Sequence, residues 1–387
     1  MGIAITQEQR ELADSVRGWI ARAVPPDEVR KLLDAPTAPG VRPPHWDGLA
    51  AQGLLGLHLP EECGGQGGTL LDLAVAVEEA GRAALPGPFL GSVLAAEVLR
   101  RAGRTDLARE LAAGERIGAV ALGPGALSAV AGPDGLVLDG TAPPVLTGAD
   151  ADLLVLAAET AGGTVWLAVD AAGPGVHVRA HDSADPTRPT AEVTASGAAV
   201  PAGRVLAVAP GLVRDLAAVL LAADACGGAA RSLATAAEHA KVREQFGRPI
   251  GQFQGVKHLC ADMLLRVETS CALVWDAARA VDEDGSSRDA RALDEDGPGG
   301  DACALVVALA AGAALDAAYG CAKDCIQILG GTGFTWEHDA HLYLRRAVIA
   351  RQLLGAGDAH RLRAVRLAET GARRELRLDL PAAAQPY

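Results

Sequence analysis

This sequence is poor in aromatic residues, in positive charge and in closely spaced cysteines. Aromatic side chains make up only 3% of the 387 residues, and just four of them are Phe. The chain carries 48 acidic and 35 basic residues, which gives a formal net charge of −13. Nucleic-acid binding needs clustered Lys and Arg, and anionic membranes attract the same residues. We therefore expect neither nucleic acid nor a membrane as a partner.

The sequence also lacks the features of an exported or metal-binding protein. Residues 1–20 contain no apolar core followed by a cleavage site of the signal-peptide type. Apolar runs such as 304–315 are too short to span a bilayer and predict buried helix. Cys321 and Cys325 lie four residues apart in a predicted helix, but no His or further Cys completes a metal site. We predict no metal and a reducing, cytoplasmic location.

The periodicity of the sequence changes twice along the chain. Residues 1–114 have helical spacing and open with Thr6 and Gln9 in the positions of a capping box. Residues 115–208 contain short β-rich runs separated by Gly, Pro and Asp about every ten residues, which is typical of an antiparallel sandwich or barrel. Residues 209–387 return to long, Ala-rich helices. Because helices and strands form separate blocks, we predict an α+β fold with these three domains and no Rossmann unit. Strands are predicted at 135–140, 152–157, 164–170, 175–180 and 191–197, and long helices at 212–245, 252–282, 301–329 and 338–370.

The stretch VREQFGRPIGQFQGVKH (242–258) interrupts a predicted helix with two glycines and a proline, and contains two of the four Phe residues. Arg243 offers a permanent, planar charge that suits a pyrophosphate, and Phe246 could cover an adenine or ribose face. The alternative is that Arg243 forms a surface ion pair and Phe246 belongs to the core. A second stretch, QILGGTGFTWEHDAHLYLRRA (327–347), places Gly330 and Gly331 where a bare backbone could approach a ligand closely.

These stretches, with the helix–strand–helix order, resemble the acyl-CoA dehydrogenase flavoprotein family. The first is similar to that family's Arg-x-x-Phe-Gly-x-x-Ile-x-x-Phe-Gln signature, and the second to its Gln-x-x-Gly-Gly-x-Gly-Phe segment and following Arg. GLLGLHLPEECGGQGG (53–68) resembles an N-terminal loop of the family. The Trp-Glu-His run at 336–338 is similar to an actinobacterial branch, many of whose members act on steroid or bulky acyl-CoA substrates.

The resemblance implies an N-terminal helical domain, a middle antiparallel β-domain and a C-terminal four-helix-bundle domain. It also implies FAD between the β-domain and the C-terminal helices, and dimers of dimers in which the two signature segments reach the neighbour's FAD. The residues expected to bind FAD are Arg243, Gln245, Phe246, Phe253, Gln254, Gln327, Gly330 and Gly331.

The same resemblance locates the catalytic base, and this chain has no carboxylate there. Family members remove an α-proton with a Glu while the β-hydride goes to the flavin. One family position lies nine residues after Arg345 and is Leu354 here. The other lies 26 residues before Arg243 and is Ala217 here. The catalytic residue therefore stays unassigned.

Three nearby carboxylates, Asp215, Asp224 and Asp358, are weak candidates for the base. Asp215 is two residues from Ala217, so it would point about 160° away from it around a helix. Each is more simply a cap, a surface charge or a helix partner. The stretches 121–132 and 140–152 also lack the hydroxyl-rich loop and the aromatic that the family places against the flavin ring.

Three hypotheses follow. The first is that the chain is a subunit of a heteromeric FAD-dependent acyl-CoA dehydrogenase whose partner supplies the Glu. The second is that it is a self-sufficient dehydrogenase with an unrecognised base such as Asp215. The third is a fold repurposed for a non-dehydrogenase or non-redox role in a biosynthetic pathway. The expected ligands are FAD and an acyl-CoA or acyl-carrier-protein thioester. The expected protein partners are a second acyl-CoA dehydrogenase-like chain or a second copy, and an electron-transfer flavoprotein as a further possibility.

Overall fold

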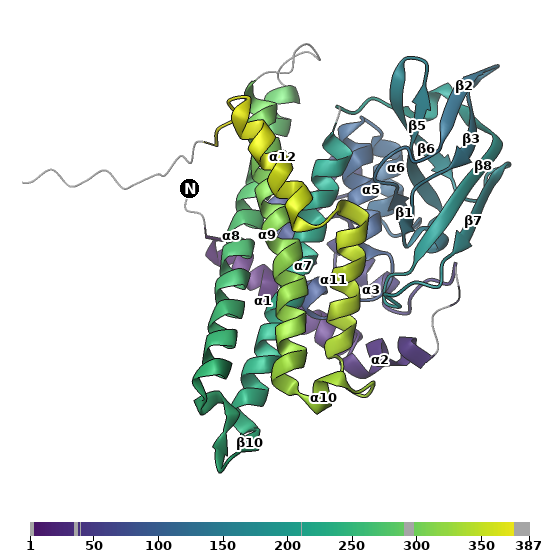
Figure 1. The fold of residues 1–387 in the computed structure, drawn as a ribbon. Helices are drawn as coiled ribbons and strands as arrows, with labels where there is room; N and C mark the ends of the chain where they lie inside the picture. Colours follow the sequence, from purple (N-terminus) through teal and green to yellow (C-terminus); the bar gives the residue numbers. More distant parts are fainter. Residues whose placement is uncertain (1–3, 35–37, 39, 210, 290–297, 375–387) are drawn as a thin grey trace, which may run out of the picture.

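The structure, a computed structural model, describes residues 4–34, 38, 40–209, 211–289 and 298–374. Figure 1 shows a β-sheet on one side, the long helices α7, α8 and α9 side by side on the other, and α5 and α6 between them. The predicted order of helices, strands and helices is confirmed. The N-terminal helices are α1 (Gln7–Ala23), α2 (Pro26–Asp34), α3 (Trp46–Ala51), α4 (Leu70–Arg82), α5 (Phe89–Arg101) and α6 (Thr105–Ala112), with the short 3-10 helices η1 (Leu54–Gly56) and η2 (Glu61–Cys63).

The first helix begins where the sequence predicts it. The Thr6 side chain accepts a hydrogen bond from the Gln9 backbone N–H, and the Gln9 side chain accepts one from the Thr6 N–H. Thr69 and Asp72 form the same capping box at the start of α4. Each box satisfies two of the backbone donors that a helix leaves unpaired at its N-terminus.

The middle of the chain forms a nine-stranded sheet within the described residues. Seven strands follow the order β4-β8-β3-β2-β5-β6-β9, while β1 pairs with β5 and β7 pairs with β8 beside this path. All five predicted strands are present, and the sequence missed the short strands β1, β2, β4 and β9. Neighbours pair mostly antiparallel, but β1 and β2 both pair with β5 in parallel, which local periodicity does not show. The strands are β1 (Gly118–Val120), β2 (Ser128–Gly132), β3 (Gly135–Thr141), β4 (Val145–Leu146), β5 (Leu153–Thr160), β6 (Gly163–Asp170), β7 (Val176–Ala180), β8 (Thr190–Pro201) and β9 (Val205–Leu206).

Two helices of the C-terminal part differ from prediction. The helix expected at 252–282 continues to Asp289. The single helix expected at 338–370 is two helices, because Gly355 has a φ of 100° that ends the first of them. Only glycine adopts such a backbone without strain. The helices are α7 (Leu212–Val242), α8 (Gln254–Asp289), α9 (Pro298–Leu329), α10 (Gly331–Phe334), α11 (Ala340–Leu354) and α12 (Gly357–Glu369).

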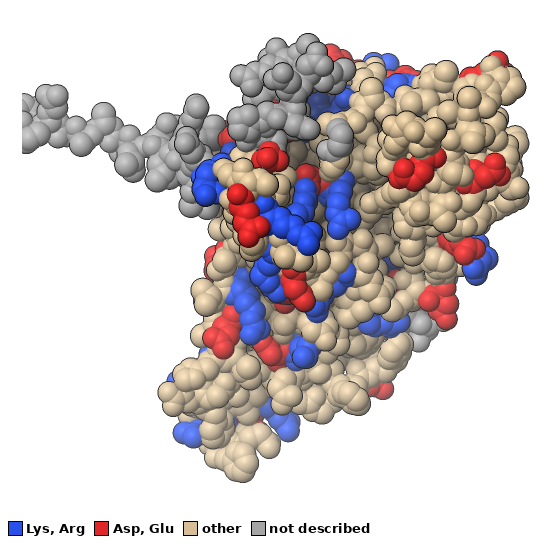
Figure 2. Space-filling view, turned by 45° about the horizontal axis from the view of Figure 1, so that its top comes forward, with Lys and Arg blue, Asp and Glu red and all other residues tan. Residues whose placement is uncertain are grey.

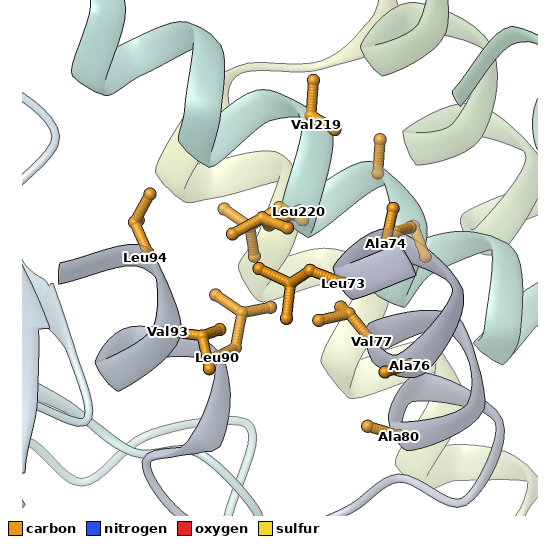
Figure 3. Packing of buried hydrophobic residues seen from close by; sticks show 14 of the residues in the cluster. Leu73, Ala74, Ala76, Val77, Ala80, Leu90, Val93, Leu94, Val219 and Leu220 are labelled. Atoms are coloured by element: carbon orange, nitrogen blue, oxygen red, sulfur yellow. The ribbon is translucent and has the colours of Figure 1, made fainter. Parts of the chain in front are cut away.

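The N- and C-terminal helices share one hydrophobic core, which Leu153 and Val155 of β5 join, whereas Leu154 and Leu156 of the same strand belong to a second core within the β-domain. Figure 3 shows Leu73 and Val77 of α4, Leu90 of α5 and Leu220 of α7 meeting in this helical core. Where α4 and α7 cross, a Cβ added at Gly227 would lie 1.9 Å from the Glu78 carbonyl oxygen. The bare glycine backbone therefore allows these helices to approach each other closely.

Two helices are long and apolar enough, by length and composition alone, to cross a membrane: Leu212–Val242 and Asp301–Leu329. Their most apolar stretches are 83% and 56% buried inside the protein. A core helix of a globular protein has the same length and composition, and both helices contribute to the shared core.

Candidate functional site

A cavity of about 570 Å³ lies between the β-domain and the C-terminal helices. Its β-domain wall comes from residues 122–123, 125, 143–144 and 181–184, with Thr190. The helical wall comes from Arg214 at the start of α7 and from Ile349, Gln352 and Leu353 near the end of α11. We call it the interdomain cavity. Both β-domain stretches that the sequence marked as lacking flavin contacts contribute to it.

Two polar side chains of the β-domain wall differ in their hydrogen bonding: His181 is held by Thr190, whereas Ser183 bonds no described residue. The His181 N–H donates to the Thr190 carbonyl oxygen (2.9 Å), and the ring Nδ1 of His181 lies 3.0 Å from Thr190 Oγ1. Ser183 Oγ is buried and has no hydrogen-bond partner among the described residues. The sequence interpretation missed His181, Asp182 and Ser183. The available signal was a polar run between two predicted strands, at the edge of the sheet.

Neither family position for the base holds a carboxylate near the cavity. Leu354 is the last residue of α11 and Ala217 lies on α7, and both are buried in the helical core. The Leu354 carbonyl accepts a hydrogen bond from the Arg214 guanidinium (3.0 Å). A cation and a helix end thus lie next to the place where the family carries its Glu.

The three weak candidates for the base all lie close to arginines, and none of them lines the interdomain cavity. Asp215 forms a 2.6 Å ion pair with Arg363. Asp358 is a surface residue in the first turn of α12, 3.7 Å from Arg361. Asp224 is buried in a separate ion cluster. Among the described carboxylates, only Asp182 lines the interdomain cavity.

The cluster around Asp224 connects the two walls of the cavity. Arg346 of α11 contacts both carboxylate oxygens of Asp224 on α7, and Arg188 of the β-domain lies 3.1 Å from the same carboxylate. Burial alone would raise the pKa of Asp224, but the two arginines outweigh it and hold that pKa below its usual value. Arg346 also donates to Thr187 Oγ1 (2.9 Å), so the cluster holds the 181–190 loop against α11.

Five of the eight expected FAD residues lie together at the opposite end of the helical bundle. The predicted kink is a short hairpin of β10 (Glu244–Gln245) and β11 (Arg248–Pro249), at the lower end of Figure 1. Phe246 forms the turn with a φ of 54° and is 92% exposed, and its ring meets Phe253 edge-on at 6.1 Å. No ion pair of Arg243 occurs among the described residues, which argues against the surface-ion-pair alternative. Gln245 and Gln254 are also exposed.

The other three expected residues, Gln327, Gly330 and Gly331, lie at the end of α9. Gly330 has a φ of 61°, and a Cβ added at it or at Gly331 would meet nothing within 4 Å. Phe334 next to them is 90% exposed. Because α7 ends, α8 begins and α9 ends at one end of the bundle, both signature segments share this surface, which we call the bundle end.

The bundle end and the interdomain cavity are separate surfaces of this chain. The 15 residues of α11 lie between Phe334 and the cavity, a rise of about 22 Å. An arginine that pairs with no described carboxylate, exposed aromatic rings and a bare glycine backbone suit the phosphates and adenine of FAD. These groups all lie on the exposed surface of the chain.

The chain was then compared with known families. The family model "Acyl-CoA dehydrogenase, N-terminal domain" matches residues 6–114, and "Acyl-CoA dehydrogenase, C-terminal domain" matches residues 215–368. The chain belongs to the acyl-CoA dehydrogenase family. This confirms the predicted fold; the family it belongs to consists of FAD-dependent oxidoreductases that act on acyl thioesters.

The similar proteins agree with the predicted actinobacterial branch. Acyl-CoA dehydrogenase FadE34 of Mycobacterium tuberculosis is 40% identical over 98% of this chain, although the match covers only 50% of FadE34. Acyl-CoA dehydrogenase IpdE2 of Mycolicibacterium smegmatis is 33% identical over 91% of this chain and 96% of its own length. The chain therefore spans half the length of FadE34 but nearly all of IpdE2.

Two solved structures share the fold over almost the whole chain. The ChsE4-ChsE5 complex of Mycobacterium tuberculosis gives a TM-score of 0.86 at 29% identity, covering 96% of this chain and 100% of that one. A variant of the Tcur3481-Tcur3483 steroid ACAD gives 0.82 at 27% identity, covering 95% and 99%. Each of these two descriptions names a pair of proteins.

Figure 2 shows the charge distribution over the ends of the helices. Lys and Arg side chains gather on the helical half of the molecule, and the β-domain in this view shows mostly uncharged residues with a few carboxylates. Several of the arginines there are paired, as Arg363 is with Asp215 and Arg361 is with Asp316 at 2.9 Å. These ion pairs hold α12 against α7 and α9.

Proposed function

We propose that this chain is a subunit of a heteromeric FAD-dependent dehydrogenase that introduces an α,β double bond into an acyl thioester. The proposal is supported by two features that occur together in the described part of the chain. One is a bundle end that carries Arg243 without an ion pair and exposed Phe246 and Phe334, and the other is a cavity without the family's Glu. The partner would supply the base and most contacts to the flavin ring. This chain would supply contacts to the partner's FAD.

The assignments at the bundle end follow from the chemistry of each group. The Arg243 guanidinium would bind phosphate oxygens, and Phe246 would cover an adenine or ribose face. Gly330 and Gly331 would let backbone groups approach the cofactor, while Gln327, Gln245, Gln254 and Phe253 would complete the contact. FAD, when bound, accepts the hydride; the residues of this chain bind and orient it.

The heteromer is supported by the relatives. Two of the structures similar to this chain over nearly their whole length are described by the names of two different proteins. FadE34 contains a stretch as long as this chain that the match does not cover, which leaves room for a second unit of the same size. We propose a second acyl-CoA dehydrogenase-like chain as the partner, acyl-CoA as the substrate class, and the cytoplasm as the location. An acyl-carrier-protein thioester and an electron-transfer flavoprotein remain further proposals for substrate and electron acceptor.

Purification tests this proposal. The chain expressed alone should be colourless, and co-expression with a candidate partner should give a yellow complex with the visible absorbance of FAD. In that complex Arg243→Ala should lower the affinity for FAD about tenfold or more, because a charged group at a phosphate contributes more than about 1.4 kcal/mol. Arg179→Ala, an exposed arginine on β7, is the control and should change nothing. One FAD per subunit in the chain alone would contradict the proposal and favour a self-sufficient, homo-oligomeric enzyme.

A second candidate function is a repurposed fold with a non-redox role. The buried Leu354 and Ala217 at the base positions favour it. The non-redox role would be favoured if the chain stayed colourless with each candidate partner, and if Arg243→Ala changed neither thioester binding nor complex formation.

A further inference from the structure

We propose that His181 is an acid–base residue of the interdomain cavity and accepts the α-proton of an acyl thioester bound there. This inference rests on the proposed thioester chemistry but concerns this chain's own cavity, not the partner's FAD site. It assigns a role to a residue outside the signature segments and outside both family positions for the base.

The position of His181 is set by two hydrogen bonds to one residue. Its backbone N–H donates to the Thr190 carbonyl, and its ring Nδ1 lies 3.0 Å from Thr190 Oγ1. These bonds close the end of the β7–β8 ladder, where Ala180 pairs with Ala191. When Nδ1–H donates to Thr190, Nε2 carries the free lone pair. No described residue bonds Nε2, and it is not sealed from solvent.

The other groups of the cavity suit a proton transfer. Arg214, Gln352 and the Ser183 hydroxyl, which bonds no described residue, all line it and are hydrogen-bond donors. A donor at the thioester oxygen stabilises the negative charge that develops there when the α-proton leaves. Apolar surface for an acyl chain comes from Leu122, Ile349, Pro143 and Pro144.

The competing bases are less suited. Asp182 is exposed, so water screens it, and no described residue orients its carboxylate. Asp215 is held by Arg363 and does not line the cavity. His181 is thus the one proton acceptor among the described lining residues whose side chain is oriented by a second side chain.

The step is balanced without an oxidant. The Cα–H bond breaks, its proton forms a bond with Nε2, and its electron pair moves into the thioester enolate. In D₂O the imidazolium exchanges its proton with solvent and returns a deuteron to the α-carbon. The reaction therefore appears as deuterium exchange and does not need bound flavin.

The experiment measures deuterium incorporation into two probes, butyryl-CoA and 3-phenylpropionyl-CoA, by mass spectrometry in D₂O. The full chain is used, or the complex with the partner's base changed to Gln if the chain is purified only as a complex. We expect exchange above the buffer rate with at least one probe. His181→Asn should lower it about 100-fold, in the range of general base catalysis, while the probe's Kd changes less than about twofold. Thr190→Val should lower it about tenfold, since it removes the group that orients the ring.

His177→Asn is the matched control, because His177 lies four residues earlier on β7, is exposed and does not line the cavity. It should keep the full exchange rate. The inference is overturned if His181→Asn exchanges like the unchanged protein, if its Kd rises in proportion to its loss of exchange, or if neither probe exchanges. FAD content and its response to Arg243→Ala are measured separately, so a failure of the proposed function is distinguishable from a failure of this inference.

Discussion

Substituting Gly227 by Ala tests whether the close crossing of α4 and α7 sets the stability of the helical core. The added Cβ would lie 1.9 Å from the Glu78 carbonyl oxygen and 2.5 Å from the Arg82 backbone nitrogen. Ordinary contact between a carbon and an oxygen atom begins at about 3.4 Å, so α4 and α7 would have to separate by about 1.5 Å at this point. Both obstacles are backbone atoms of α4, which no side-chain rotation can move.

The size of the effect follows from two opposing contributions. Forcing an extra carbon into a close-packed core costs about 1–3 kcal/mol and sometimes more, whereas Gly to Ala inside a helix gains about 0.5–1 kcal/mol. The same crossing is close at a second point, where a Cβ added at Gly81 of α4 would lie 2.1 Å from the Asp224 carbonyl oxygen, so separating the helices loosens packing along the whole contact. We expect a net loss of about 1–2 kcal/mol in the free energy of unfolding.

The neighbouring glycine provides the control. A Cβ at Gly228 meets only Tyr343 Cδ1 at 3.7 Å, which is ordinary contact. Gly228→Ala should therefore keep or raise the stability by up to about 1 kcal/mol. Urea unfolding of both variants, followed by far-ultraviolet circular dichroism, measures the difference. A Gly227→Ala variant as stable as Gly228→Ala would refute the reasoning and show that the crossing adjusts freely.

Further predictions concern buried charges. Asp224→Asn should cost about 3–5 kcal/mol, because it removes the carboxylate between two buried arginines and leaves Arg188 only its 3.6 Å contact with Asp185 among the described ion pairs. Urea unfolding measures the loss, and a value below about 1 kcal/mol would contradict the stabilising role of the cluster. Burial, with the neighbouring Glu79, raises the pKa of Glu78 from 4.5 to about 7, so the folded state binds its proton more tightly. The contribution of this proton to the free energy of unfolding is complete below pH 4.5 and is lost as the pH rises to about 7. In the unchanged protein the free energy of unfolding should therefore decline by about 3 kcal/mol at most across this range, and Glu78→Gln should remove that decline. The same pH dependence of stability in both proteins would refute the prediction. Asp215→Asn should leave dehydrogenation and α-proton exchange unchanged, because Asp215 is engaged by Arg363; a large loss of turnover would restore it as a candidate base.

Local signals in the sequence predicted the elements well. The capping box at Thr6 marked the start of α1, and the alternation of strand and turn residues located β3, β5, β6, β7 and β8. The break at Gly355 was missed because Ala, Leu and Arg on both sides favour helix, and only the backbone conformation shows that the glycine ends it. The parallel pairing of β1 with β5 depends on contacts distant in sequence, which no local pattern encodes.

The spacing of Arg243, Phe246 and Gln327 assigned these residues to two sequence motifs, and the structure places both motifs at the bundle end. Their contact with FAD stays a prediction. The interdomain cavity was not assembled from the sequence, since His181, Arg214 and Gln352 come from three separate segments that meet only when the β-domain docks on α7 and α11.

The sequence alone determined the family, the order of helices and strands, and the absence of Glu at both base positions, because these depend on residue type and spacing. The tertiary structure decided where those residues lie. It separated the bundle end from the interdomain cavity by the length of α11, engaged Asp215 and Asp224 with arginines, and placed His181 in the cavity wall. These outcomes depend on which helix faces approach each other, and glycines such as Gly227 and the buried charge cluster set that approach through contacts between distant parts of the chain.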